Sequence, residues 1–229
     1  MKRLFLTILF LSFCATAFAG ESQLKKATNV INEIMVTPDK GIPDELLEKS
    51  VCVGIVPSQM KFAFGLGGTY GRGVLVCRKG GNGAWDAPSM FTLGAASVGF
   101  QIGGKATDVV FLVMNPEGMK KLVQDSVKLG AELSVAAGPV GRSAEGATDA
   151  QLHAEILSYS RSRGLFGGAS LDGAVYKQDK DDNQKVYGRR VTAKEILIDG
   201  TVRTPRAAQG LDSALTKYSP AGGRTFDRL

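Results

Sequence analysis

The sequence predicts one α+β domain: a mostly antiparallel, strongly curved, glycine-rich sheet or small barrel with flanking amphipathic helices. Glycine supplies 29 of the 229 residues. It recurs through strand-like sequence between residues 62 and 104, where missing side chains permit sharp bends and close backbone approach. Helical periodicity is concentrated in segments 22–36, 115–129 and 205–217. No Pro- or Ser-rich linker interrupts the chain, so a single domain is the economical expectation.

The N-terminal half is expected to begin with a helix and to continue as sheet. Leu24, Ala27 and Ile31 recur at helical spacing. Pro38 ends this helix, because the residue before a proline avoids helical angles. A short helix with proline in its first turn and a nearly all-apolar buried strand follow. The expected segments are a helix over 43–49, strands over 51–56, 73–79, 91–105 and 108–114, and a turn over 80–83.

The C-terminal half is expected to open with the clearest helix of the chain. Asn115 supplies an N-cap, Pro116 a first-turn proline and Glu117 an acid that suits the helix dipole. Thr192 and Glu195 form a capping box for a second, short helix. The remaining expected segments are strands over 131–137, 154–162 and 169–177, a polar turn over 177–183 and a final helix over 205–217.

The first nineteen residues predict a cleavable secretory signal. Lys2 and Arg3 form a positive n-region, residues 4–13 an apolar h-region, and residues 17–19 (Ala-Phe-Ala) the small residues that signal peptidase accepts. The apolar run is short for a bilayer, since a spanning helix needs about 20 apolar residues. A lipoprotein signal ending at Cys14 is the less favoured alternative, because a bulky phenylalanine precedes that cysteine.

The expected layout is therefore a signal peptide over 1–19, a folded domain over 20–218 and a flexible C-terminal tail over 219–229. The protein is expected to be exported to the periplasm. The chain has 28 Lys and Arg against 22 Asp and Glu, and loss of the signal would leave 26 basic residues. This mild excess suits anionic head groups or cell-wall polymers, but it is equally an ordinary surface. Nucleic acid is disfavoured, because the basic residues are dispersed and the protein is exported.

Cys52 and Cys77 are the two cysteines of the mature chain. In an oxidising compartment they could form a disulfide. Both stand in apolar, strand-like runs, where buried free thiols are the alternative. Sequence spacing does not decide between the two, because a disulfide needs its Cα atoms within bridging range.

No catalytic residue, metal site or cofactor is predicted. His153 is the single histidine, which excludes multi-histidine metal sites. A serine hydrolase using Ser97 and His153 is an unfavoured alternative, because a nucleophile elbow needs a sharp strand-to-helix turn and Ser97 lies in strand-like sequence. Asp179, Asp181 and Asn183 imitate the start of a calcium loop, but the required glycine and closing acid are absent.

Two segments are candidate lipid-binding sites. Lys25 and Lys26 stand beside the apolar stripe of the first helix and would suit an anionic membrane, although most such stripes pack on a core. The second candidate places two cations before two large apolar side chains in an expected loop. Its residues are Arg161, Arg163, Leu165 and Phe166.

The order of several glycine-containing motifs resembles the SYLF domain family. The resemblance covers residues 31–200, nearly the whole expected domain. Its motifs are Gly54–Pro57 (GIVP), Phe64–Gly73 (FGLGGTYGRG), Trp85–Pro88 (WDAP), Gly99–Gly103 (GFQIG), Gly138–Arg142 (GPVGR), Gly164–Gly173 (GLFGGASLDG) and Tyr187-Gly188.

This resemblance implies phospholipid binding, with an amphipathic N-terminal helix contributing in eukaryotic members. Segment 22–36 occupies the corresponding place here. Some eukaryotic members bind actin and carry SH3 or FYVE domains, roles that are not expected of an exported bacterial chain. The sequence thus predicts non-catalytic binding of anionic phospholipid at the envelope membrane surface. A periplasmic protein-interaction or structural module, with envelope proteins as partners, is the alternative.

Overall fold

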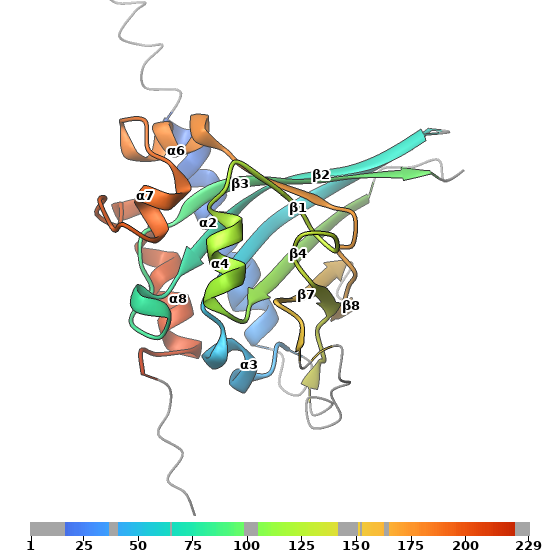
Figure 1. Ribbon diagram of the computed structural model, residues 1–229, viewed down its shortest axis with the longest axis horizontal. Coiled ribbons are helices and arrows are strands. Elements are labelled where there is room, and N and C mark those ends of the chain that lie inside the picture. Colours follow the sequence, from blue (N-terminus) through green and yellow to red (C-terminus); the bar gives the residue numbers. More distant parts are fainter. Residues whose placement is uncertain are drawn as a thin grey trace, which may run out of the picture.

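The computed structural model describes residues 17–36, 41–64, 66–98, 105–141, 151, 153–162 and 165–222 (Figure 1). These residues form one curved sheet with helices on both of its faces, which confirms the predicted α+β class. The helices are α2 (Ala17–Met35), α3 (Asp44–Lys49), α4 (Pro116–Leu122), α6 (Lys180–Tyr187), α7 (Ala193–Leu197) and α8 (Gln209–Tyr218), with short 3₁₀ turns η1 (Lys79–Gly81) and η3 (Arg206–Ala208).

The sheet of the described residues contains nine strands in the order β5-β9-β3-β2-β1-β4-β7-β6, and β8 pairs with β7. All neighbouring strands are antiparallel except β6 and β7. The strands are β1 (Cys52–Phe64), β2 (Leu66–Cys77), β3 (Ser89–Val98), β4 (Lys105–Val113), β5 (Ser126–Lys128), β6 (Val135–Ala137), β7 (Ile156–Ser162), β8 (Leu165–Gly168) and β9 (Val175–Gln178).

The two faces of the sheet carry separate hydrophobic clusters. In β4, Val109, Phe111 and Val113 belong to one cluster, whereas Val110 and Leu112 belong to the other, because successive strand residues point to opposite faces. We call the Phe111 side the inner face and the Val110 side the outer face. Helices α4 and α7 contribute buried residues to the inner cluster, and α2, α3 and α8 to the outer one (Figure 1).

Helix α2 uses its apolar stripe to cover part of the outer face. Leu24, Ala27 and Ile31 are completely buried, and Ile34 is 3% exposed. The stripe therefore packs on the protein's own core, and the helix presents mainly its polar side to solvent. The structure begins this helix at Ala17, inside the predicted signal sequence.

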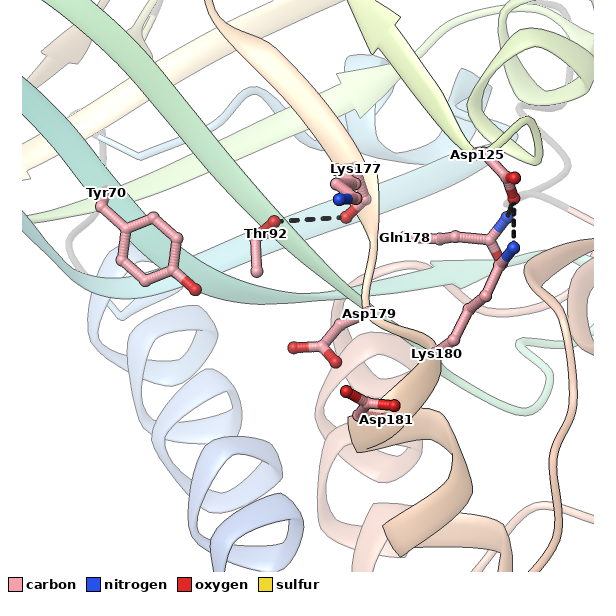
Figure 2. Close-up of a pocket in the computed structure, with 8 residues that line it drawn as sticks. All are labelled: Tyr70, Thr92, Asp125, Lys177, Gln178, Asp179, Lys180 and Asp181. Atoms are coloured by element: carbon pink, nitrogen blue, oxygen red, sulfur yellow. Dashed lines mark hydrogen bonds and ion pairs between the residues drawn. The ribbon is translucent and has the colours of Figure 1, made fainter.

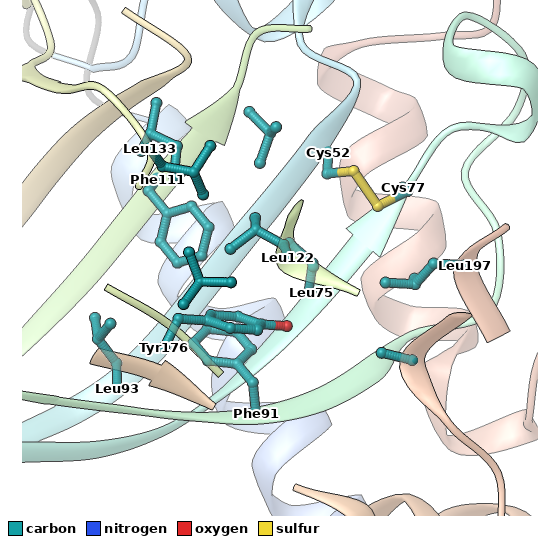
Figure 3. Packing of buried hydrophobic residues seen from close by; sticks show 14 of the residues in the cluster. Cys52, Leu75, Cys77, Phe91, Leu93, Phe111, Leu122, Leu133, Tyr176 and Leu197 are labelled. Carbon is teal, nitrogen blue, oxygen red and sulfur yellow. A yellow bond between two sulfur atoms is a disulfide. The ribbon is translucent and has the colours of Figure 1, made fainter. Parts of the chain in front are cut away.

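Three aromatic rings, Phe91, Phe111 and Tyr176, lie together on the inner face (Figure 3), and glycines provide room for two of them. Gly54 pairs with Phe111 across β1 and β4, and a Cβ on Gly54 would lie 2.1 Å from the Phe111 ring. Gly73 pairs with Phe91 in the same way, at 2.4 Å. The Phe91 ring packs edge-on to Phe111 at 5.7 Å and stacks on Tyr176 at 4.6 Å. The cross-strand glycines thus allow large rings to fill the curved sheet, an architectural role.

Cys52 and Cys77 form a disulfide beside this cluster (Figure 3). They are direct cross-strand partners in β1 and β2, and their Cα atoms are 4.0 Å apart. Both are buried. The bond joins the start of one hairpin strand to the end of the other.

The strands expected over 131–137 and 169–177 are shorter in the structure, since β6 begins at Val135 and β9 at Val175. Two other expected elements differ in kind. The helix predicted over 115–129 ends at Leu122, and Val127 is instead the buried centre of β5; its spacing fits either element, and pairing with β9 selects the strand. The polar turn predicted over 177–183 is wrong. Residues 180–187 form α6, capped by Asp179, whose carboxylate accepts a hydrogen bond from the Asp182 amide at 2.9 Å.

The sequence pattern does not indicate helix α6, because the buried residues that hold it against the sheet are polar. Asp182, 2% exposed, forms ion pairs with Arg72 and Lys185. The Asn183 side chain accepts a hydrogen bond from the Met90 amide at 2.7 Å. Arg72 and Met90 lie far away in the sequence, whereas Lys185 is three residues from Asp182. Because the buried residues of α6 are polar, the segment lacks the apolar periodicity by which helices are recognised.

A buried arginine fixes the start of the predicted C-terminal tail. Arg78 is 3% exposed and donates hydrogen bonds to the carbonyls of Ser50, Gly83, Ser219 and Pro220. Its guanidinium lies 4.0 Å from the centre of the Trp85 ring, a cation–π geometry. Burial lowers the pKa of Arg78, with an opposing contribution from Glu48. Residues 219 and 220 are therefore part of the folded domain, and residues 223–229 lie outside the described part.

Candidate functional site

An exposed apolar row crosses the outer face beyond the edge of α2. Met60, Tyr70, Gly94 and Val175 are successive cross-strand partners on β1, β2, β3 and β9. The three larger side chains are 42%, 50% and 41% exposed, respectively. We call these four residues the outer-face row. Large apolar side chains gathered on one face are a typical mark of an interaction surface.

Lysines border the outer-face row. Lys128 on β5 pairs with Val175 and extends the row by one strand, and Lys177 lies two residues beyond Val175 on the same face of β9. Both are exposed. Neither forms an ion pair with another residue in the described ranges, so both positive charges are available to a ligand.

Helix α2 adds a third cation along one edge of the row. Gln23 donates to the carbonyl of Arg72, and Glu33 forms an ion pair with Arg161. Lys26 shares the helix edge of Gln23 and Glu33, because residues three and seven positions apart lie on one side. Lys25, one position earlier, is turned about 100° away, as 3.6 residues per turn require. Helical phase therefore distinguishes two lysines that the sequence analysis had paired.

A pocket of about 700 Å³ opens beside Tyr70 (Figure 2). It continues past Gly94 towards Lys128 as a second hollow of about 500 Å³. Its lining combines one aromatic ring with charges of both signs. The lining residues of the first pocket are Tyr70, Thr92, Asp125, Lys177, Gln178, Asp179, Lys180 and Asp181.

Some pocket charges already have partners within the protein. Asp125 pairs with Lys180 at 2.7 Å and accepts a hydrogen bond from Gln178 at 2.5 Å. The hydrogen bond from Lys180 is the main cause that lowers the pKa of Asp125. Asp179 caps α6 and lies 3.8 Å from the Arg72 guanidinium. These groups shape the pocket wall.

The structure separates the lipid-binding residues predicted from sequence. Arg161 pairs with Asp108 at 2.7 Å and with Glu33 of α2, so its charge is used inside the fold. Burial opposes the charged form of Arg161, but these acids outweigh it and raise its pKa. Lys26 and Glu33 are seven positions apart in α2, about 10 Å along the helix. Lys25, Lys26 and Arg161 therefore do not form one cluster.

The residues of the second predicted segment also lie in different environments. Leu165, 80% exposed, stands at the start of β8. Phe166 is partly buried and stacks on Tyr159 at 5.5 Å, as a core residue does. Arg163 lies outside the described residues. Leu165 alone is thus an exposed apolar group of this segment, away from the outer-face row on the opposite side of β4 and β7.

The candidate hydrolase residues occupy distant parts of the sheet. Ser97 lies in β3 and pairs with Gly67 in regular antiparallel register. His153 is exposed just before β7, and β2, β1 and β4 lie between those two strands. Among the described residues, no group of three or more His, Cys, Asp or Glu could hold a metal ion. Within the same residues, no helix has the length and hydropathy needed to cross a membrane.

Sequence reasoning missed the outer-face row, because its members come from four strands. Met60 follows a bulge in β1, where the register shifts and Ser58 adopts a positive φ of 53°. That bulge resets which residues face outward. An available signal was the FGLGGTYGRG motif, in which Tyr70 is the one large side chain among small ones between Leu66 and Arg72.

Comparison with known proteins identifies one family and several relatives of this chain. Residues 94–218 match a family described as "Ysc84: Las17-binding protein actin regulator". LAS seventeen-binding protein 3 of Saccharomyces cerevisiae is 35% identical over 222 residues, which cover 90% of this chain and 48% of that protein. SH3 domain-containing YSC84-like protein 1 of Homo sapiens is 33% identical over 216 residues, covering 89% and 62%. The chain thus spans roughly half the length of the curated relatives it matches.

Proposed function

Because the chain belongs to the Ysc84 family, whose relatives are named as binding and regulatory proteins, we propose that it binds anionic phospholipid at a membrane surface without catalysis. The SYLF resemblance noted in the sequence is the same family assignment, and it is confirmed. The relatives' names refer to Las17 and actin regulation. Those names belong to longer proteins. For this chain we propose export and contact with lipid of the cell envelope instead.

The observation that supports this proposal is the outer-face row with its lysines. Met60, Tyr70 and Val175 are exposed apolar side chains of one cross-strand row, and Lys128 and Lys177 flank this row on the same face. Membrane-surface proteins combine these features, because apolar side chains enter the boundary between head groups and acyl chains while cations meet anionic lipid. Aromatic side chains such as tyrosine suit this boundary, since one end is apolar and the other polar.

The expected electrostatic contribution is large enough to measure. A lysine near an anionic membrane surface is worth about 1 kcal/mol. Neutralising Lys26, Lys128 and Lys177 together should therefore cost about 3 kcal/mol, which weakens binding by roughly two orders of magnitude. Binding should also weaken as salt rises, because salt screens exposed charges.

Vesicle flotation tests the proposal. The wild type should float with phosphatidylcholine vesicles that contain phosphatidylglycerol at low salt, and it should not float with phosphatidylcholine alone. The triple variant Lys26→Gln/Lys128→Gln/Lys177→Gln should lose most of this binding. A matched triple variant of exposed lysines on other elements, Lys120→Gln/Lys194→Gln/Lys217→Gln, should retain it. Absence of wild-type binding at low salt would overturn the proposal.

A paired substitution tests the role of helical phase. Lys26→Glu should weaken binding to phosphatidylglycerol vesicles, because Lys26 lies on the edge that contacts Arg72 and Arg161. Lys25→Glu makes the same change of charge on a different side of α2, so its effect should be smaller. Equal effects of the two variants would show that net charge alone, and not the outer face, governs attraction to the membrane.

A further inference from the structure

We propose that the pocket beside Tyr70 recognises a lipid head group that carries both a phosphate and a primary ammonium, as phosphatidylethanolamine does. This inference rests on the proposed function, because it assigns a ligand to the pocket that adjoins the outer-face row. In this proposal the pocket selects the head group, and the lysines around it attract anionic membranes in general.

The pocket keeps charged groups of both signs after the protein's own ion pairs are formed. Lys180 is paired with Asp125, and Asp179 lies against Arg72. Lys177 and Asp181 also line the pocket and are exposed. Neither forms an ion pair with any residue in the part of the chain that the structure describes. One positive and one negative group therefore share a pocket without neutralising each other.

The arrangement of these two groups gives the ligand a direction. Lys177 stands on the outer face next to Val175, at the border of the apolar row. Asp181 lies in the first turn of α6, at the far wall of the pocket (Figure 2). A phosphate at the membrane boundary would meet Lys177, and a positive group attached to it would extend towards Asp181. The acyl chains would then lie over the outer-face row.

The carboxylates favour a primary ammonium over a quaternary one. A primary ammonium has three N–H donors, which carboxylate oxygens accept in charge-assisted hydrogen bonds. A choline group has no donor and is usually held by several aromatic rings, whereas this pocket is lined by the single ring of Tyr70. A serine head group would bring its own carboxylate towards those of Asp179 and Asp181, and like charges repel. Ethanolamine is the head group that fits best.

The test compares vesicles of constant phosphatidylglycerol content in which phosphatidylethanolamine replaces phosphatidylcholine. The wild type should bind the ethanolamine vesicles about threefold more tightly, as expected of an exposed ion pair. Asp181→Asn should abolish this preference. Glu117→Gln, which removes an exposed first-turn acid from α4, should leave it intact. The ratio of the two affinities is the readout, so a general change of net charge cancels.

The possible outcomes separate the two proposals. If the wild type binds both kinds of vesicle equally, or if Asp181→Asn keeps the preference, the head-group assignment is overturned while binding to anionic membranes stands. If the wild type binds neither kind, the proposed function fails and the head-group assignment fails with it. Loss of the preference in Asp181→Asn alone supports the assignment.

Discussion

Replacing Gly54 with alanine should destabilise the domain by creating a clash in the inner core. The new Cβ would lie 2.1 Å from the Phe111 ring, far inside van der Waals contact. The ring has little room to retreat, because Phe91 packs against it at 5.7 Å and Tyr176 in turn stacks on Phe91 at 4.6 Å. Overpacking of a tight core costs about 1–3 kcal/mol. We expect the upper part of this range.

Urea unfolding followed by circular dichroism measures this loss. Thermal unfolding gives a second readout, because in a domain of this size each kcal/mol of lost stability lowers the Tm by about 2–4 °C. Gly167→Ala is the matched control: Gly167 also lies in a strand, but its added Cβ meets nothing within 4 Å. Adding Phe111→Leu to Gly54→Ala should recover part of the loss, since it removes the clashing ring. An unchanged urea midpoint for Gly54→Ala would refute the architectural role of this glycine.

Two further predictions concern a covalent bond and a carboxylate. Replacing Cys52 and Cys77 with alanine should lower the free energy of unfolding by about 2–4 kcal/mol, because the disulfide restricts the unfolded chain; urea midpoints that match those of the oxidised wild type would contradict this. Burial disfavours the charged form of Glu155, but hydrogen bonds from Ser134 and Lys121 outweigh burial and lower its pKa. Its stabilisation is therefore present above the unfolded pKa of about 4.3 and disappears as the pH falls through the lower folded value. Glu155→Gln should cost about 1–3 kcal/mol at pH 7, and the difference from wild type should shrink in unfolding experiments below about pH 4; a difference independent of pH would show that the charge is not responsible.

Local signals in the sequence predicted the parts of the fold that depend on nearby residues. The Asn115 cap and the Thr192–Glu195 capping box are present as expected, because each joins groups only three residues apart. The role of the glycines was also predictable, since glycine inside strand sequence indicates close approach. The actual neighbour of Gly54, the ring of Phe111, depends on β1–β4 register and could not be read from local sequence.

The candidate site was harder to predict, because long-range contacts create it. Lys25 and Lys26 stood out as adjacent cations, but only the contacts of Gln23 and Glu33 reveal which helix edge borders the row. Arg161 also stood out, yet Asp108 across the sheet neutralises it. Exposure of the outer-face row depends on where α2 stops covering the sheet, a tertiary property that the local sequence marks only by Tyr70, the large side chain among the small residues of the FGLGGTYGRG motif.

The same reasoning explains why α6 was missed although its residues were noticed. Asp179 and Asp181 imitate the start of a calcium loop in sequence, but the segment lacks the glycine and the closing acid that such a loop needs. In the structure, Asp179 is a helix cap and Asp181 lines the pocket. Polar side chains in a short segment can form a turn, cap a helix or line a binding site. Which of these they do depends on the residues that they contact in the fold.

Membrane contact through the outer face is tested most directly by fluorescence quenching of an introduced tryptophan. Tyr70→Trp and, as a control on the exposed side of α8, Thr216→Trp would be mixed with phosphatidylglycerol vesicles whose acyl chains carry bromine. Trp85, 5% exposed and common to both variants, supplies a constant background. The outer-face account predicts strong quenching at position 70 and little at position 216. Quenching that is equal at the two positions, or greater at 216, would contradict it.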